Sequence, residues 1–387
     1  GCYLFNSNFG LVFASPPHDS GRVPVSRRAT ESTPVIHVEY PLGMPGTPPT
    51  PPRLFVVGSF VEAHCWTVAT RPRPDESQLA HGYVRECAGK GLAVAVGAHR
   101  LGAAVDLLVA AGADAAGDAL VDLLKREGLS TALVQRLGAV SGHGCGLIAA
   151  EGESTVTVFQ GANALLGEAE LRAAAPDLRQ AALVYAQLES PLALVRSALE
   201  MGGKAGAVTV LNASPWPSAQ EGAAGEEDLA NWAATLAAAR ILVVNRAEAA
   251  RWLSELGVVD RRLDALAPST LAAIWRAWPA GGWLVVTLGG YGCVAYGRDG
   301  ARYREHAHAV AHPHPIGAGD AFSAGLCRAL AADGAMSEAL RLANACGALA
   351  AGRAGIISGL PRWAEVQRLL VADAPPGDGG SADAGLE

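Results

Sequence analysis

The sequence lacks the excess of basic residues that marks a nucleic-acid-binding protein. Its 387 residues include 30 Lys and Arg against 37 Asp and Glu, which gives a formal net charge of −7. Proteins that bind nucleic acid concentrate Lys and Arg on one face. We therefore predict that nucleic acid is not a partner of this chain.

Cysteine motifs and long apolar runs are missing as well. The seven cysteines are scattered, and none forms a C-x-x-C pair. An odd number of isolated thiols is typical of a reducing compartment rather than of a disulfide framework or a zinc site. The sequence contains no stretch of about 18 uninterrupted apolar residues, so we predict no membrane span. We expect a cytoplasmic protein with no membrane partner.

Aromatic residues are few, at 6%, although half of the chain is hydrophobic. The core must therefore be built of small and aliphatic side chains, which suits helices packed tightly on a sheet. Both ends depart from this composition, because residues 1–52 are rich in Pro, Ser and Thr and residues 373–387 in Gly, Ala, Asp and Pro. We predict that both ends are disordered, and that Met44 is the natural start.

Short β-rich runs alternate with Ala-rich helical segments between residues 53 and 372. The predicted strands of this series are 53–58, 107–112, 182–187, 207–212, 241–244 and 283–288. This alternation predicts an α/β fold with a doubly wound, mostly parallel sheet covered by helices on both faces. Two hairpins, near 60–88 and 143–162, interrupt the series. We expect them to pair with each other as a small β-lid outside the main sheet.

The segment Gly317-Ala318-Gly319-Asp320 carries the strongest local signal for chemistry. Its two glycines allow a tight turn and a close approach to a ligand. A helix is predicted to begin near Asp320, so that its free N–H groups and positive dipole end form an anion site. An aspartate after glycines is also a common helix N-cap, and the four residues alone do not separate the two interpretations.

The longer segment Gly317–Gly325, with the sequence GAGDAFSAG, resembles the signature of the ribokinase family, also called the phosphofructokinase-B family. Four further segments resemble family motifs in the same order, namely 88–102, 187–191, 245–248 and 287–292. The resemblance implies a ribokinase-like kinase domain that transfers the γ-phosphate of ATP to a hydroxymethyl group of a small sugar. It implies that Asp320 is the catalytic base, and that the amides of Gly317, Ala318 and Gly319 form the anion hole.

The resemblance also implies where ATP and Mg²⁺ bind. Asn245 and Glu248 would support Mg²⁺ through its waters, and a capping box at a helix start is the structural alternative for this pair. The remaining nucleotide-binding residues implied by the resemblance are Thr287, Gly289, Gly292 and Asn344. A plain turn between strands is the alternative for the two glycines, and a surface position is the alternative for Asn344.

Four residues would bind the acceptor: Gly89, Lys90, Gly91 and Glu189. Lys90 would reach a hydroxyl or phosphate oxygen, and a solvated loop lysine is its structural alternative. Glu189 follows a predicted strand, at the edge of the sheet where α/β proteins bind ligands. Family members also suggest a homodimer contact through the lid.

The sequence departs from the ribose-binding pattern in ways that matter for the substrate. Val61, Ala63 and Ala93 occupy positions where ribokinases carry polar residues, and Glu62 falls on the opposite face of its strand. The lost hydrogen bonds, about 1–3 kcal/mol each, weaken the case for ribose and leave a nucleoside kinase open. A non-catalytic, ligand-sensing relative is a further alternative. His314-Pro315 replaces the Asp-Thr pair that helps to bind K⁺ in ribokinases, so we predict little K⁺ activation.

Overall fold

The computed structural model describes residues 50–149, 154–217, 226–259, 262–311, 314 and 316–372. The ends predicted to be disordered, 1–52 and 373–387, lie outside this part of the chain except for residues 50–52.

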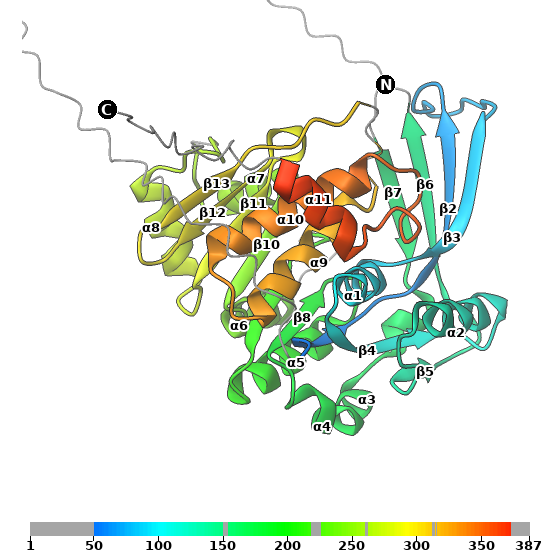
Figure 1. The fold of residues 1–387 in the computed structure, drawn as a ribbon, viewed down its shortest axis with the longest axis horizontal. Coiled ribbons are helices and arrows are strands. Elements are labelled where there is room, and N and C mark those ends of the chain that lie inside the picture. Colours follow the sequence, from blue (N-terminus) through cyan, green and yellow to red (C-terminus); the bar gives the residue numbers. More distant parts are fainter. Residues whose placement is uncertain are drawn as a thin grey trace, which may run out of the picture. The chain divides into compact units, whose positions relative to one another are not determined.

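A nine-stranded sheet forms the centre of the domain (Figure 1). In spatial order its strands are β13 (Arg302–Glu305), β12 (Cys293–Gly297), β11 (Trp283–Thr287), β10 (Ile241–Asn245), β9 (Val208–Asn212), β8 (Leu183–Gln187), β1 (Arg53–Val57), β4 (Ala104–Ala111) and β5 (Val134–Arg136). All neighbours pair in parallel except β11–β12 and β12–β13, which are antiparallel. The predicted mostly parallel sheet is confirmed, with an antiparallel edge.

Helices cover both faces of this sheet. One face carries α1 (Lys90–Arg100), α2 (Ala115–Glu127), α9 (Ala318–Ala331), α10 (Met336–Ala351) and α11 (Trp363–Ala372). The other carries the 3₁₀ turn η1 (Gly161–Leu165), α3 (Glu168–Ala173), α4 (Ala175–Leu178), α5 (Leu192–Lys204), α6 (Glu226–Ala238), α7 (Arg246–Glu255) and α8 (Pro268–Ala277). Strand β1 shows why the central strands are apolar throughout: Leu54 and Val56 join one core, whereas Phe55 and Val57 join the other. A strand buried on both faces has no polar side.

Small side chains bring the two helices that border the site close together. A methyl group added at Gly97 of α1 would lie 2.7 Å from the Cβ atom of Ala324 of α9. The small-residue composition therefore serves close helix packing.

The two hairpins pair with each other, as expected, and form a separate four-stranded sheet (Figure 1). Its strands are, in order, β3 (Gly82–Ala88), β2 (Val61–Val68), β6 (Gly142–Ala149) and β7 (Ser154–Phe159). Strands β2 and β6 pair in parallel, with Glu62 opposite His143 and His64 opposite Cys145. We call this sheet the lid.

The first hairpin of the lid joins the main domain at both of its ends, at strand β1 and at helix α1. Strand β2 begins four residues after β1 ends, and β3 ends two residues before α1 begins. The carboxylate of Glu86 on β3 also accepts hydrogen bonds from the amides of Ile356 and Ser358. These connections hold the lid beside the carboxyl ends of the main strands.

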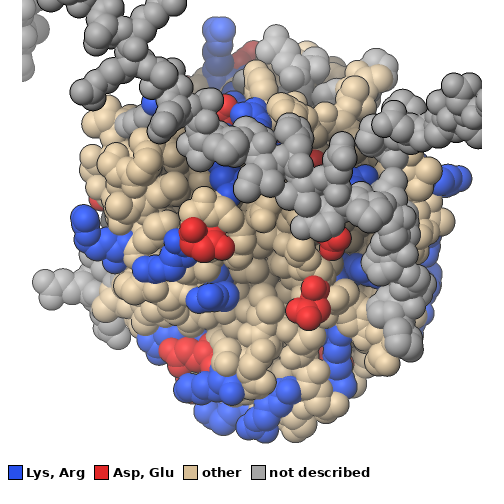
Figure 2. All heavy atoms as spheres, turned by 60° about the vertical axis from the view of Figure 1, so that its left-hand side comes forward, with Lys and Arg blue, Asp and Glu red and all other residues tan. Residues whose placement is uncertain are grey.

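On the face of the molecule in Figure 2, basic and acidic side chains are interspersed.

Candidate active site

The strand order reverses between β1 and β8. From β1 the chain runs outward through β4 and β5, and it then returns to β8 and proceeds in the other direction through β9, β10 and β11. In α/β sheets such a reversal leaves a crevice beyond the carboxyl ends of the strands, where ligands bind. The predicted site residues gather at this edge.

Ser59 and Glu189 join the two strands across this reversal. The Ser59 hydroxyl, just after β1, donates to Oε2 of Glu189 at 2.6 Å, and the backbone N–H of Lys90 donates to the same oxygen at 3.1 Å. Glu189 is buried. Its Oε2 atom therefore anchors the start of α1 to the end of β8, which leaves Oε1 for the acceptor-binding role predicted from the sequence.

The predicted anion site lies at the start of α9. Gly317 is the N-cap and has a left-handed backbone with φ 87°, a conformation that favours glycine. The first intrahelical bond runs from the N–H of Ala321 to the carbonyl of Gly317 at 3.0 Å. The four N–H groups from Gly317 to Asp320 therefore have no acceptor within the helix, and they include the three predicted for the anion hole. A methyl group added at Gly319 would meet no atom within 4 Å, so the approach to these amides is open.

Lys90 brings the acceptor side and the phosphate side of the site together. Burial would lower the pKa of the Lys90 ammonium, but the negative charges of Asp320, Glu189 and Glu248 outweigh that effect and raise it. The four residues come from the starts of α1, α9 and α7 and from the segment after β8. Lys90 is thus a partly buried cation among three carboxylates, and the alternative of a solvated loop lysine is wrong.

The surroundings of Asp320 disfavour the charged form of its carboxyl group. Burial raises its pKa from 3.8 to about 6. The Lys90 ammonium lowers this pKa, whereas the charges of Glu189 and Glu248 raise it. At neutral pH the carboxylate is mostly ionised, and it is a stronger proton acceptor than an ordinary aspartate.

Asn245 and Glu248 form the capping box that was the structural alternative for this pair. The Glu248 N–H donates to Oδ1 of Asn245 at 2.9 Å, and the Asn245 N–H donates to Oε2 of Glu248 at 2.8 Å. Burial raises the pKa of Glu248, while the Asn245 amide, the Ser214 hydroxyl and the charge of Lys90 oppose that rise. Asn245 and Glu248 can cap the helix and also lie at the edge of the site, because α7 begins where β10 ends.

The residues predicted to hold the nucleotide lie beside this pair. Asn245 and Thr287 are neighbours in register at the carboxyl ends of β10 and β11. A methyl group added at Gly289 would meet no atom within 4 Å, whereas one at Gly292 would lie 1.9 Å from the carbonyl oxygen of Glu305. Gly289 is therefore open to a ligand, and strand packing accounts for Gly292.

Asn344 is buried on α10 rather than at the surface, and its Nδ2 donates to the carbonyl oxygen of His306 at 2.6 Å. It holds the segment between β13 and α9 against α10. The alternative of a surface position for Asn344 is therefore wrong, whereas its predicted place beside the adenine stays a prediction.

Packing also explains the two glycines around Lys90. A methyl group at Gly89 would lie 2.3 Å from the Ser59 carbonyl oxygen, and one at Gly91 would lie 2.2 Å from the Cα atom of Gly58. Both glycines are therefore required for the start of α1 to approach the end of β1. This is a sufficient reason for glycine at both positions without a bound ligand.

Comparison with known proteins agrees with this geometry. The family model described as "pfkB family carbohydrate kinase" matches residues 52–363. The chain belongs to the pfkB family of carbohydrate kinases.

Individual relatives point the same way. The ribokinase of Haemophilus influenzae is 26% identical over 318 residues, which cover 82% of this chain and 98% of the relative. Among solved structures, Arabidopsis thaliana ribokinase complexed with ribose and ATP has a TM-score of 0.68 at 20% identity, covering 83% of this chain and 99% of that one. A Burkholderia thailandensis nucleoside kinase in complex with inosine has a TM-score of 0.67 at 21% identity, covering 83% of this chain and 98% of that one. The ribokinase-like fold predicted from the sequence is confirmed.

This pfkB-family chain has an apolar inner lid face. Val61 and Ala63 are each 5% exposed and pack with Ala88, Val158 and Ile356. Paired strand residues show that Glu62 lies on the other face together with His143. The sequence expectation that Glu62 lies on the opposite face of its strand from Val61 and Ala63 is therefore confirmed.

Sequence reasoning missed three residues of this pfkB-family site. Ser59 donates to Glu189, and the Ser214 hydroxyl acts on Glu248. Ser59 directly follows the predicted strand 53–58 and Ser214 lies two residues after the predicted strand 207–212, positions that could have singled them out. Tyr185 is fully buried in β8, where burial and the charge of Asp320 raise the pKa of its hydroxyl while the nearby side chains of Asn212 and Ser323 oppose that rise. Nothing in the apolar run around Tyr185 indicates this position.

Among the described residues, no helix is long and apolar enough to cross a bilayer.

Proposed function

We propose that this chain is an ATP-dependent kinase that phosphorylates a hydroxymethyl group of a small sugar, with Asp320 as the base. The observation that carries the proposal is the joint position of Asp320, the open amides at the start of α9 and the Lys90 ammonium. A carboxylate, an anion site and a cation in one crevice are what phosphoryl transfer to an alcohol requires. The similarity to an Arabidopsis ribokinase complexed with ribose and ATP supports the same pair of substrates.

The roles of the residues follow from their positions. Asp320 accepts the proton of the acceptor hydroxyl while that oxygen forms its bond to the γ-phosphorus and the bond to the β–γ bridging oxygen breaks. The N–H groups of Gly317, Ala318 and Gly319 would face the charge on the transferring group. Lys90 neutralises charge at the same place. Catalysis here consists of positioning and charge stabilisation, with no covalent enzyme intermediate.

The residues at the carboxyl end of β10 suit a hydrated Mg²⁺ ion. Glu248 is a buried carboxylate with one oxygen committed to the Asn245 N–H, which fixes its orientation. Asn245 and Glu248 would hold the ion through its waters, consistent with the reluctance of Mg²⁺ to lose them. When bound, Mg²⁺ supplies neutralisation of phosphate charge. Thr287 and Gly289 would contact the phosphates and ribose of ATP, and Asn344 would border the adenine.

The acceptor is the less constrained part of the proposal. Gly89, Lys90, Gly91 and Glu189 lie on the acceptor side, but Val61 and Ala63 offer it only apolar atoms. This inner lid face favours an acceptor with an apolar portion, so a nucleoside kinase is a second candidate. The relative in complex with inosine supports it.

An ADP-release assay over a panel of sugars and nucleosides tests the proposal. We expect ATP-dependent turnover with at least one acceptor, and loss of about 10²–10⁴ of it in Asp320→Asn. The acceptors that turn over decide between the sugar and nucleoside candidates. Binding of acceptors in a thermal-shift screen without turnover of any would instead support a non-catalytic, ligand-sensing relative and refute the proposal.

The lid offers a sharper test of the acceptor. Replacing Val61 by Asn and Ala63 by Asp together restores polar groups on the inner face. We expect the kcat/KM for D-ribose to rise and that for a nucleoside to fall, because buried hydroxyls gain partners. Equal changes for both acceptors would show that this face does not contact them.

A further inference from the structure

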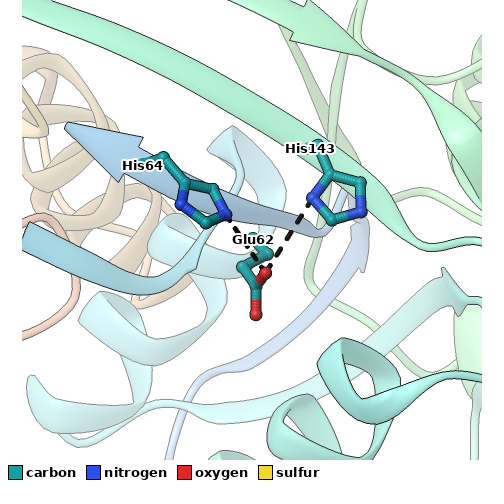
Figure 3. A group of neighbouring side chains, drawn as sticks. All are labelled: Glu62, His64 and His143. Atoms are coloured by element: carbon teal, nitrogen blue, oxygen red, sulfur yellow. Dashed lines mark hydrogen bonds and ion pairs between the residues drawn. The ribbon is translucent and has the colours of Figure 1, made fainter.

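The outer face of the lid carries a group of three metal-ligand side chains that the kinase chemistry does not use. Glu62 and His64 stand on β2, and His143 stands opposite Glu62 on β6 (Figure 3). One ligand atom from each lies within 4.8 Å of the others. Both imidazoles turn toward the carboxylate of Glu62 in Figure 3.

The distances suit a small ion between these atoms. Nε2 of His64 lies 3.2 Å and Nδ1 of His143 lies 3.9 Å from the same oxygen, Oε2 of Glu62. Ligand atoms about 2.0–2.2 Å from a tetrahedral Zn²⁺ ion lie roughly 3.3–3.5 Å from one another. The His64–Glu62 pair lies within about 0.1 Å of this spacing. The two pairs that involve His143 are wider, at most 4.8 Å apart, and a rotation of the His143 side chain would shorten them.

The remaining polar atoms of Glu62 and His64 are held by neighbours on β3. Arg85 donates to Oε1 of Glu62 at 2.6 Å, and Nδ1 of His64 lies 2.8 Å from the Tyr83 hydroxyl. Metal ligands in proteins are commonly oriented in this way through the atom that does not bind the metal. The converging atoms, Oε2 of Glu62 and Nε2 of His64, are the ones that β3 leaves available.

The positive charge of Arg85 opposes a cation here, but its side chain is 56% exposed, so solvent screens it. The His143 side chain is 39% exposed, and Glu62 lines a cavity of about 580 Å³ between the lid and α2. Solvent can therefore reach the His143 side chain and one side of Glu62. The group is partly buried and reachable, as a binding site must be.

We propose that Glu62, His64 and His143 bind one divalent transition-metal ion, of the class of Zn²⁺, Co²⁺ or Ni²⁺, on the outer face of the lid. Two imidazoles and one carboxylate match the donors of three-ligand zinc sites, whereas Mg²⁺ and Ca²⁺ require oxygen ligands. The site is thus separate from the Mg²⁺ that the kinase reaction would use. It also links β2 to β6, two strands far apart in the sequence.

Isothermal titration of the untagged full chain tests the site, with Zn²⁺ as the probe after EDTA treatment and dialysis, and with a non-chelating reductant present. We expect one ion per chain at micromolar or tighter affinity. His64→Ala and His143→Ala should each weaken binding by about tenfold or more. His81→Ala, at an exposed position before β3, is the matched control and should bind as the wild type does.

Thiols on the same face need their own control, because Cys87 pairs in register with Glu62 and Cys145 with His64. Binding that survives Cys145→Ser and Cys87→Ser supports the proposal. Absence of Zn²⁺ binding by the wild type, or binding lost in a Cys variant and retained in His143→Ala, overturns it. His143 is well exposed, so its variant should fold, and the absorption of bound Co²⁺ gives a second readout that does not depend on kinase activity.

Discussion

Replacing Asp320 by Asn should abolish activity and stabilise the fold at neutral pH. The carboxylate is partly buried at the start of α9, and burial raises its pKa from 3.8 to about 6. A raised carboxyl pKa means that the folded state binds the proton more tightly than the unfolded state does. Folding stability attributable to this group is therefore fully present below pH 4 and is lost as the pH rises through about 6.

The size of this effect follows from the shift. A difference of about two pKa units corresponds to about 3 kcal/mol between the protonation states. An asparagine side chain carries no charge at any pH, so Asp320→Asn should not show this loss. The stability difference between the variant and the wild type should grow between about pH 4 and pH 6, and should level off near pH 7 at no more than about 3 kcal/mol.

Urea unfolding at several pH values measures this difference, and the pH profile of kcat/KM measures the same group kinetically. We expect kcat/KM to fall below about pH 6, because the base must be ionised to accept a proton. A stability difference that does not change between pH 4 and pH 7 would refute the reasoning. So would an acidic limb of kcat/KM below about pH 4.5.

Four further predictions address the neighbouring residues and the monovalent cation. Gly91→Ala should lower the free energy of unfolding, measured by urea unfolding, by about 1–3 kcal/mol, because the added methyl group has no room beside the loop after β1. Gly319→Ala should leave urea unfolding unchanged. It should reduce kcat/KM by about 10²-fold, because its methyl group obstructs only the anion site. Lys90→Met should move the acidic limb of kcat/KM to higher pH, because the cation that lowers the pKa of Asp320 is gone; an unmoved limb would place Lys90 outside the site. Replacing Na⁺ by K⁺ should change the rate little, since His314 offers an imidazole rather than oxygen, and a severalfold rise in rate would contradict this.

The sequence allowed the layers of the fold to be predicted because each rests on a local pattern. The strands at 182–187, 207–212, 241–244 and 283–288 all appear within a residue or two of their predicted bounds. Apolar runs closed by polar or glycine residues specify buried strands directly. The pairing of the two hairpins could also be predicted, because neither fits the helix–strand alternation.

The candidate site was predictable only in part, because local sequence cannot separate contacts made with a ligand from contacts made within the fold. Gly91 and Gly292 are glycines because the backbone of another segment lies against them. Asn344 is buried against the His306 carbonyl, a contact 38 residues away in sequence. The raised pKa of Lys90 depends on carboxylates from three separate segments of the chain. No local sequence pattern indicates that these charges come together.

Ile356 connects two parts of the protein that the chain otherwise keeps apart. It packs against Val61 and Ala63 of the lid, and its Cα atom lies 3.3 Å from where a methyl group on Gly317 would stand. Movement of the lid away from the crevice would disturb this contact together with the hydrogen bonds that Glu86 of the lid accepts from the amides of Ile356 and Ser358. A bulkier side chain at position 356 would therefore press on both the lid and the start of α9. We expect such a variant to impair lid movement and phosphate binding together.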